Sequence, residues 1–150
     1  MSLILDGTSG ITTPGPVNGA ATMLSPITNS LSSDVLLNNT ANYFDGPSVA
    51  QGTSGTWFAS GTVTLLDQSS QASYFVKLWD GTTVIASTRM TSVATGEQCA
   101  ISLSGFITSP AANLRISVRD ASSTGGKIVY GVTYGSGNTK DSTITAIRIG

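Results

Sequence analysis

The sequence has 150 residues, of which 10% are charged, and its net charge is −1. An ordinary soluble domain contains about 25% charged residues, so the 21 Thr and 22 Ser must supply much of the polar surface. A net charge of −1 gives no electrostatic footprint for nucleic acid, which requires clustered Lys and Arg, and we predict no nucleic-acid partner. Because the chain has no His, the usual general base and commonest metal ligand are missing. We therefore predict no enzyme activity, no metal and no cofactor.

The cysteine count and the N-terminal residues set two further bounds. A single cysteine, Cys99, cannot form an intrachain disulfide, and its place in a strand-like run predicts a buried apolar side chain. The apolar runs are too short for a spanning helix, and MSLILDG lacks the features of a secretion signal. We expect synthesis in a cytoplasm and no membrane partner. So low a charge suits a protein whose surface is used in an assembly.

Residues 1–33 differ in composition from the rest of the chain. They contain Pro14 and Pro16 and one charged residue, Asp6. Proline lacks the N–H that a central strand needs and restricts the residue before it. We predict an extended N-terminal docking arm that adds to a partner or a second subunit, or alternatively wraps its own domain. Its anchor side chains would be apolar: Leu3, Leu5, Met23, Leu24 and Ile27.

Residues 34–150 read as an all-β domain. Short runs rich in Val, Ile, Thr, Phe and Tyr are separated by Gly, Asn, Asp and Ser at intervals typical of an antiparallel sandwich. About nine strands are predicted and no helix, which favours a jelly-roll-like β-sandwich over an immunoglobulin-like one. The strongest local signal is a hairpin over residues 74–90, with Asp80-Gly81 as a two-residue turn of positive φ. A second turn signal, Asp45-Gly46-Pro47, is predicted to end a strand.

Alternation within the runs predicts which side chains face the core. Lys77 marks one face of its strand as partly solvated, and Arg115 does the same further along. The residues predicted to point inward are Trp57, Ala59, Gly61, Val63, Leu65, Tyr74, Val76, Leu78, Cys99, Ile101, Leu103, Leu114, Ile116 and Val118.

Large apolar and aromatic side chains are the remaining candidates for a binding surface. Tryptophan and tyrosine rings stack on sugars and are also common in cores and subunit interfaces. Both interpretations stay open for Trp57, Trp79, Tyr130 and Tyr134, while Phe75, Trp79 and Ile147 are candidates for an oligomer interface.

Two stretches resemble proteins of known type. The opening ILDGTSGITTPG is similar to the start of many tail-fibre and virion surface proteins of tailed bacteriophages. The segments LLNNTANYFDGPSVAQGTSGTWFASGTVT, KLWDGTTVIAS and SGNTKDSTITAIRIG resemble small β-sandwich proteins encoded among phage structural genes. The resemblance implies a virion surface protein, a capsid decoration or short fibre component, made in the bacterial host cytoplasm.

The same resemblance implies the partners of the protein. They would be further copies of the chain in a homotrimer and the major capsid or tail protein of the virion. The alternative is a receptor-binding tail-fibre module that binds a host surface glycan through the aromatic residues named above.

Overall fold

The computed structural model describes residues 4–6, 10–12, 25–131 and 139–150, and every regular element in these ranges is a β-strand in an antiparallel ladder. A bilayer-crossing helix does not occur among these residues. The strands are β1 (Ile4–Asp6), β2 (Gly10–Thr12), β3 (Ile27–Ser30), β4 (Val35–Leu37), β5 (Phe44–Val49), β6 (Thr56–Asp67), β7 (Ser73–Trp79), β8 (Val84–Thr91), β9 (Gln98–Thr108), β10 (Leu114–Asp120), β11 (Gly126–Val129) and β12 (Thr143–Arg148).

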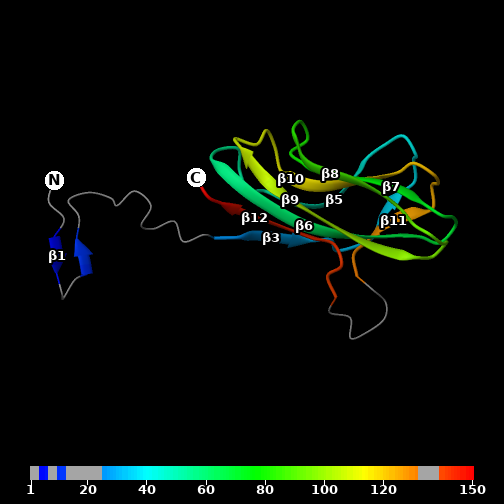
Figure 1. Ribbon diagram of the computed structural model, residues 1–150, viewed down its shortest axis with the longest axis horizontal. Helices are drawn as coiled ribbons and strands as arrows, with labels where there is room; N and C mark the ends of the chain where they lie inside the picture. The colour runs from blue at the N-terminus through cyan, green and yellow to red at the C-terminus, as the bar shows by residue number, and fades with distance from the viewer. Residues whose placement is uncertain (1–3, 7–9, 13–24, 132–138) are drawn as a thin grey trace.

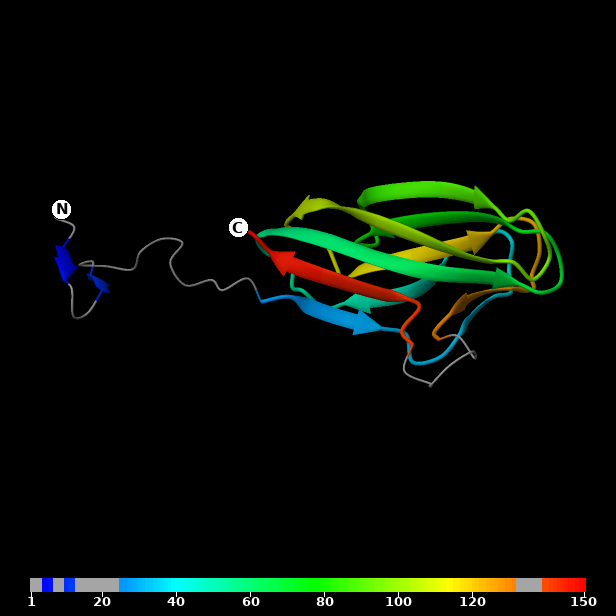
Figure 2. The same ribbon diagram turned by 60° about the horizontal axis from the view of Figure 1, so that its bottom comes forward.

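Ten of the strands form two sheets that pack face to face (Figures 1 and 2). The four-stranded sheet has the order β5-β10-β7-β8. In the six-stranded sheet, β9 pairs with one edge of β6. The other edge of β6 pairs with β12 along its first half and with β11 near its end, and β3 and β4 pair with the far edges of β12 and β11. Because the chain crosses repeatedly between the sheets, the fold is an antiparallel β-sandwich of jelly-roll type, which confirms the predicted class.

The six-stranded sheet is built around β6, a strand of 12 residues. Its sequence alternates between small or apolar residues and hydroxyl residues, and the burial of its side chains alternates with the same period. One edge pairs with β9 from residue 56 to residue 66, and the other pairs first with β12 and then with β11. Strand β6 therefore joins three strands that are distant in the sequence.

The core lies between the two sheets and requires a close approach at Gly61. A Cβ atom on this residue would lie 2.6 Å from the Thr143 carbonyl oxygen and 2.8 Å from the Ile116 Cδ1 of the opposite sheet. Fully buried large side chains fill the space around this point. They include Leu37, Leu65, Tyr74, Leu78, Leu114, Ile116, Ile128 and Ile144. Removing one such aliphatic side chain costs about 2–5 kcal/mol.

Most sequence expectations for residues 34–150 are confirmed. Nine strands, β4 to β12, follow residue 33 in the described part of the chain. The predicted inward faces of β6, β7 and β10 are the buried ones, and Cys99 is 5% exposed. Residues 74–90 form the β7–β8 hairpin, in which Tyr74 lies opposite Met90.

Two turn predictions were wrong. Gly81 has a φ of 98°, as a type I′ turn requires, but the backbone of Asp80 does not have a positive φ. Among the described residues, Ser109 is the one non-glycine residue that does. Instead the Asp80 carboxylate accepts hydrogen bonds from the backbone N–H of Thr82 and Thr83, which shapes a longer connection. Pro47 lies inside β5 and does not end it. The strand is at a sheet edge and its register with β10 shifts there, a position that tolerates proline.

Strand β3 belongs to the sandwich although it precedes residue 33. Ile27 to Ser30 pair with β12, and the Asn29 Nδ2 atom donates a hydrogen bond of 2.8 Å to the Ser48 carbonyl oxygen of the other sheet. This part of the predicted arm thus lies on its own domain, one of the two alternatives considered. The hydrogen-bonded sandwich begins at β3.

The position of β3 predicts different stabilities for two shortened chains. A chain beginning at Ser25 should melt within a few degrees of the full chain. A chain beginning at Asp34 lacks the β3–β12 ladder, and its free energy of unfolding should fall by about 2–4 kcal/mol, at about 1 kcal/mol for each lost hydrogen bond. Thermal unfolding followed by circular dichroism measures the difference. Equal melting temperatures for both shortened chains would show that β3 adds no stability.

Candidate functional site

Basic and aromatic side chains share the outer face of the four-stranded sheet. Strand β7 places Phe75, Lys77 and Trp79 on this side because alternate residues point the same way, and β10 adds two arginines by the same rule. We call this surface the cationic face. It consists of Tyr43, Phe75, Lys77, Trp79, Arg89, Arg115 and Arg119.

Each ring of the cationic face has a cation against it. The Lys77 Nζ atom lies 3.2 Å from the Trp79 ring centroid and 4.2 Å from that of Tyr43. The Arg119 Cζ atom is 4.7 Å from the Phe75 centroid, and that of Arg89 is 5.2 Å from it. Such contacts contribute about 0.5–1 kcal/mol when exposed and more when desolvated. The rings therefore favour these positions of the cations.

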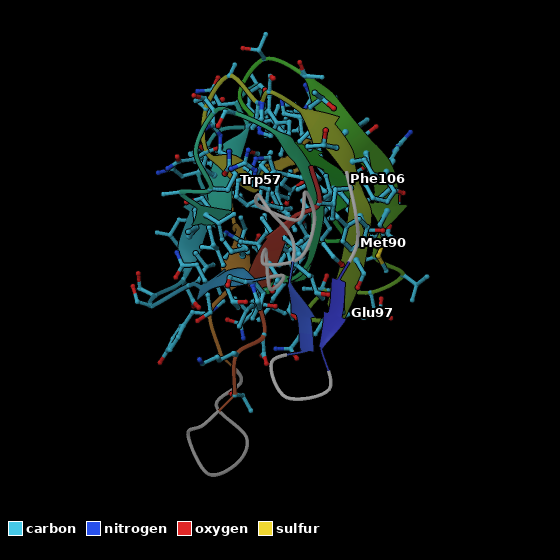
Figure 3. All side chains as sticks on the ribbon, turned by 90° about the vertical axis from the view of Figure 1, so that its left-hand side faces the viewer. Trp57, Met90, Glu97 and Phe106 are labelled. Carbon is cyan, nitrogen blue, oxygen red and sulfur yellow. The ribbon has the colours of Figure 1, made fainter. Side chains whose placement is uncertain are left out.

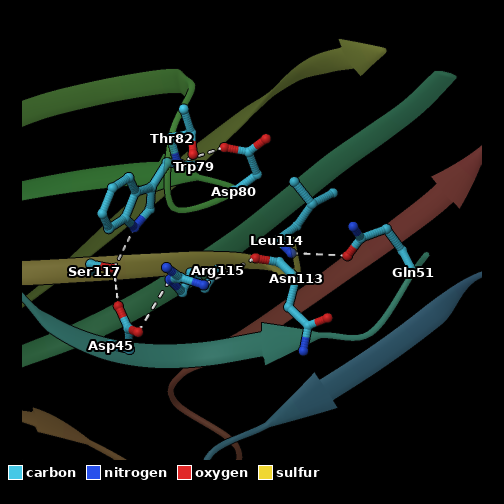
Figure 4. A network of polar contacts seen from close by, with 9 residues as sticks. All are labelled: Asp45, Gln51, Trp79, Asp80, Thr82, Asn113, Leu114, Arg115 and Ser117. Atoms are coloured by element: carbon cyan, nitrogen blue, oxygen red, sulfur yellow. Dashed lines mark hydrogen bonds and ion pairs between the residues drawn. The ribbon is translucent and has the colours of Figure 1, made fainter. Parts of the chain in front are cut away.

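A hydrogen-bonded relay ties Trp79 to the neighbouring strands (Figure 4). Its Nε1 atom donates to the Ser117 Oγ atom at 2.6 Å, and Ser117 donates to the Asp45 Oδ1 atom at 2.5 Å. The Arg115 Nε atom lies 3.1 Å from the Asp45 Oδ2 atom. Burial lowers the pKa of Lys77; Arg115 adds to the lowering, and Asp45 opposes it. The relay thereby links the three strands β7, β10 and β5 through their outward side chains.

The cationic face holds four of the chain's seven basic residues. Asp45, on β5, is the carboxylate that the described contacts place beside them. Four positive charges and one negative charge give this face +3, whereas the whole chain has −1. The net charge of the whole chain therefore does not reveal that positive charge is concentrated on this face.

The outer face of the six-stranded sheet has the opposite character. Across β3, β12, β6 and β9 its rows of side chains contain no charged residue, and hydroxyl pairs such as Thr62 with Ser102, 2.7 Å apart, link these strands. The Lys127 side chain, on β11 opposite Leu66, lies outside this part of the sheet. The Phe58 and Phe106 rings pack with centroids 5.0 Å apart, and Phe106 is 66% exposed. Figure 3 labels Phe106, which lies on β9. We call this surface the neutral face. It consists of Thr28, Phe58, Ser60, Thr62, Ser102, Ser104, Phe106, Thr143, Thr145 and Ile147.

The predicted interface and stacking residues separate onto different surfaces. Phe75 and Trp79 lie on the cationic face, whereas Ile147 lies opposite Phe58 on the neutral face. Trp57 is 6% exposed, and its Nε1 atom donates to the Ser54 carbonyl oxygen, so this ring belongs to the core.

The other predicted aromatic and arm residues are not brought together. Tyr130, which follows β11, is 47% exposed and belongs to neither face, and Tyr134 falls outside the described residues. Among the arm residues, Leu3, Met23 and Leu24 also fall outside them. Leu5 lies in β1 opposite Ile11, and Ile27 opens β3 at 37% exposure.

Sequence reasoning missed the basic members of the site. Alternation does place Arg115 and Arg119 on one side of β10, and Lys77 on one side of β7. It does not reveal that β10 pairs with β7, because β8 and β9 intervene in the chain. The signal that could have found them is the clustering of four basic residues on three alternating strands.

A separate group of buried polar residues closes one end of the sandwich. Asp67 is 2% exposed, and Asp120, fully buried, lies directly opposite Tyr74. Asp67 accepts hydrogen bonds from the backbone and hydroxyl groups of Ser69 and Ser70 and from the Ser123 hydroxyl. No set of three His, Cys, Asp or Glu side chains in the described part of the chain is arranged to hold a metal.

The pKa values of the two buried carboxyl groups, Asp67 and Asp120, are shifted in opposite directions. Burial opposes ionisation of Asp67, but hydrogen bonds from Ser123, Ser69 and Ser70 outweigh it and lower the pKa of Asp67 to about 2. Burial raises the pKa of Asp120, and the Asp67 charge acts in the same direction. Burial also raises the pKa of the Tyr74 hydroxyl. Asp67 thus loses its proton at lower pH than Asp120 does.

The sequence matches no protein-family model and no curated protein. Solved structures to which this chain is similar include the following three. The Eiger TNF protein of S. frugiperda has 10% identity and a TM-score of 0.48 over 85% of this chain and 93% of that one. The C-terminal CBM6 of LamC from Zobellia galactanivorans has 13% identity and 0.39 over 83% and 98%. The PRD1 vertex protein P5 has 14% identity and 0.37 over 83% and 95%. At these scores the likenesses carry no argument about function.

The raised pKa of Asp120 predicts that part of the free energy of unfolding depends on pH, and that the Asp120→Asn variant lacks this part. A raised pKa in the folded state stabilises the fold below the unfolded pKa of about 4, and that contribution is lost as the pH rises through the folded pKa. Asparagine keeps the acceptor for the Ser122 N–H and carries no charge. Urea unfolding from pH 4 to 8 should therefore show a shallower fall in stability, and greater stability at pH 8, for the variant.

Asp67→Asn is the matched control with the opposite sign. A lowered pKa stabilises the fold above pH 4, and this contribution disappears as the pH falls toward 2. At pH 7 the variant should lose about 2–3 kcal/mol of unfolding free energy. Identical pH profiles for Asp120→Asn and the wild type would show that Asp120 ionises normally in the fold.

Proposed function

We propose that this chain is a structural protein of a virus particle. It is a capsid decoration or short fibre component of a tailed bacteriophage, displayed on the virion surface, which stabilises or decorates the particle without catalysis. The observation that carries the proposal is the division of the chain at β3. The sandwich has a complete core from β3 onward, whereas β1 pairs with β2 in the ladders of the described residues. The sequence resemblance to phage virion proteins supports the same conclusion.

Attachment to the particle uses residues 1–24 in this proposal. The start of β3 and the end of β12 lie at the same end of the sandwich (Figure 2), where Ile27 pairs with Ala146. A segment leaving from this end can reach a major capsid or tail protein without displacing any core strand. The opposite end of the sandwich then points away from the attachment point.

The neutral face is the surface proposed for homotrimer contacts. Phe106 is 66% exposed beside Phe58 and Ile147, in a surface without charged groups. Burying such a face requires no desolvation of charges, and its hydroxyls already bond to one another. Exposed apolar groups of this kind mark interaction sites in soluble proteins.

The second candidate function is that of a receptor-binding tail-fibre module for a host surface glycan. Its support is the cationic face, where aromatic rings and unpaired cations lie together. Neutral sugars would find little open ring surface there, since the Lys77 ammonium lies against Trp79. The geometry therefore favours a charged glycan over a neutral one.

The primary proposal predicts that the protein is found on purified virions. Antibodies raised against residues 25–150 should bind, in immunogold electron microscopy, to particles from a host strain that expresses the full chain. Antibody preabsorbed with the free sandwich should give no label. A protein that stays in the soluble fraction, with particles unlabelled, would contradict the proposal.

A shortened chain tests the attachment segment in the same experiment. Particles formed in cells that express only residues 25–150 should carry no label, because the attachment segment is missing. Label on these particles would exclude residues 1–24 as the docking arm.

A further inference from the structure

We propose that the cationic face binds an acidic polysaccharide, a chain of uronic-acid sugars that presents one carboxylate on each charged unit. The inference rests on the second candidate function and specifies its ligand class. It uses the seven residues of the cationic face, none of which belongs to the core or to the neutral face.

Three of the four cations of this face are not neutralised by a carboxylate in the described part of the chain. Among the described residues, Arg115 is paired with Asp45, but Lys77, Arg89 and Arg119 have no carboxylate partner. Arg119 makes no hydrogen bond there, and its Nε atom is buried without an acceptor. A guanidinium has five N–H donors in a planar fork that matches a carboxylate. An incoming carboxylate would satisfy donors that the fold leaves unused.

Cations and rings alternate across the strands. Arg119, Phe75 and Arg89 occupy neighbouring positions on β10, β7 and β8, so a ring separates two guanidinium groups. Directly opposite residues on adjacent strands are about 5 Å apart. Arg115 lies opposite Trp79 in the same way, four residues from Arg119 along β10. The face thus repeats a pairing of one cation with one ring.

A uronic-acid unit matches this pairing because it combines two groups in one small ring. Its carboxylate can bind a guanidinium in bidentate form, while its C–H groups pack against an aromatic edge. The cations can stay against the rings when the sugar binds, because the sugar contacts a cation and a neighbouring ring at the same time. In the row between Arg119 and Arg115, Lys77 adds a further cation and the exposed Ser87 adds a hydroxyl group.

Other polyanions fit the face less well. Single-stranded nucleic acid gains affinity by stacking bases on open rings, and these rings are covered by cations. An acidic peptide presents carboxylates on flexible stems without an adjoining apolar ring. A second copy of the chain offers its described carboxylates only singly. Asp67, Asp80 and Asp120 are buried, Asp34 and Asp45 are already paired with Lys127 and Arg115, and Glu97 accepts a hydrogen bond from the Val93 N–H.

Calorimetric titration of the full chain tests the proposal with defined probes. Hexagalacturonate and an alginate hexamer supply two polyuronates, and the methyl ester of hexagalacturonate supplies the same backbone without charge. At least one acid should bind, and binding of the hexagalacturonate should be at least tenfold tighter than binding of its ester. This comparison uses the unaltered protein, so it does not depend on the folding of any variant.

Variants then locate the site. Arg119→Gln and Arg89→Gln should each weaken binding roughly tenfold, the loss expected for one charge-assisted hydrogen-bonded contact. Arg148→Gln removes the same charge from β12, away from the face, and should change affinity less than twofold. Equal losses for Arg148→Gln and Arg119→Gln would overturn the assignment.

Three further outcomes would overturn the proposal. They are failure of both acids to bind, equal affinity for hexagalacturonate and its ester, and tighter binding of poly-L-glutamate or oligo-dT than of either uronate. The virion-labelling experiment does not use these probes. A protein that labels particles but binds no polyuronate would therefore refute this inference alone.

Discussion

The close packing of the two sheets at Gly61 is the constraint on which the rest of the structure depends. A side chain there would meet the Thr143 carbonyl oxygen and the Ile116 side chain. Without that contact, β12 could not pair with β6 while β10 packs across it. Strand β6 in turn aligns β9, β11 and β12, which the chain reaches only through long connections. The pairing of strands in turn decides which outward side chains lie side by side.

A shared core leaves the two outer faces free to differ. Alternation sends the apolar side chains inward in both sheets, so the outward positions do not contribute to the core. On the four-stranded sheet they hold aromatic rings and cations, joined by the relay from Trp79 through Ser117 to Asp45. On the six-stranded sheet they hold hydroxyl groups and a strip around Phe106. One face suits a charged ligand, and the other suits contact between identical subunits.

The sequence predicted local features better than long-range ones. The period of two in β6 and β10 identified strands and buried faces, because burial enforces it residue by residue. Strand order depends on pairings between distant segments, so the approach of Arg119 to Phe75 could not be predicted. The same limit applies to β3, whose four residues carry no strong strand signal. Pro47 was wrongly predicted to end a strand, because an edge strand with a shifted register tolerates a proline that would disrupt a central strand.

Hydroxyl-radical footprinting of the full chain in solution tests most directly whether the two faces have separate roles. Phe106 is 66% exposed in the single chain and Leu36 is 61% exposed, so their oxidation rates, each divided by the intrinsic reactivity of the residue type, should be comparable if neither is covered. We predict that Phe106 is strongly protected relative to Leu36, while Trp79 on the cationic face stays reactive until a polyuronate is added. Rapid oxidation of Phe106, with Trp79 protected in the absence of any ligand, would contradict this account of the two faces.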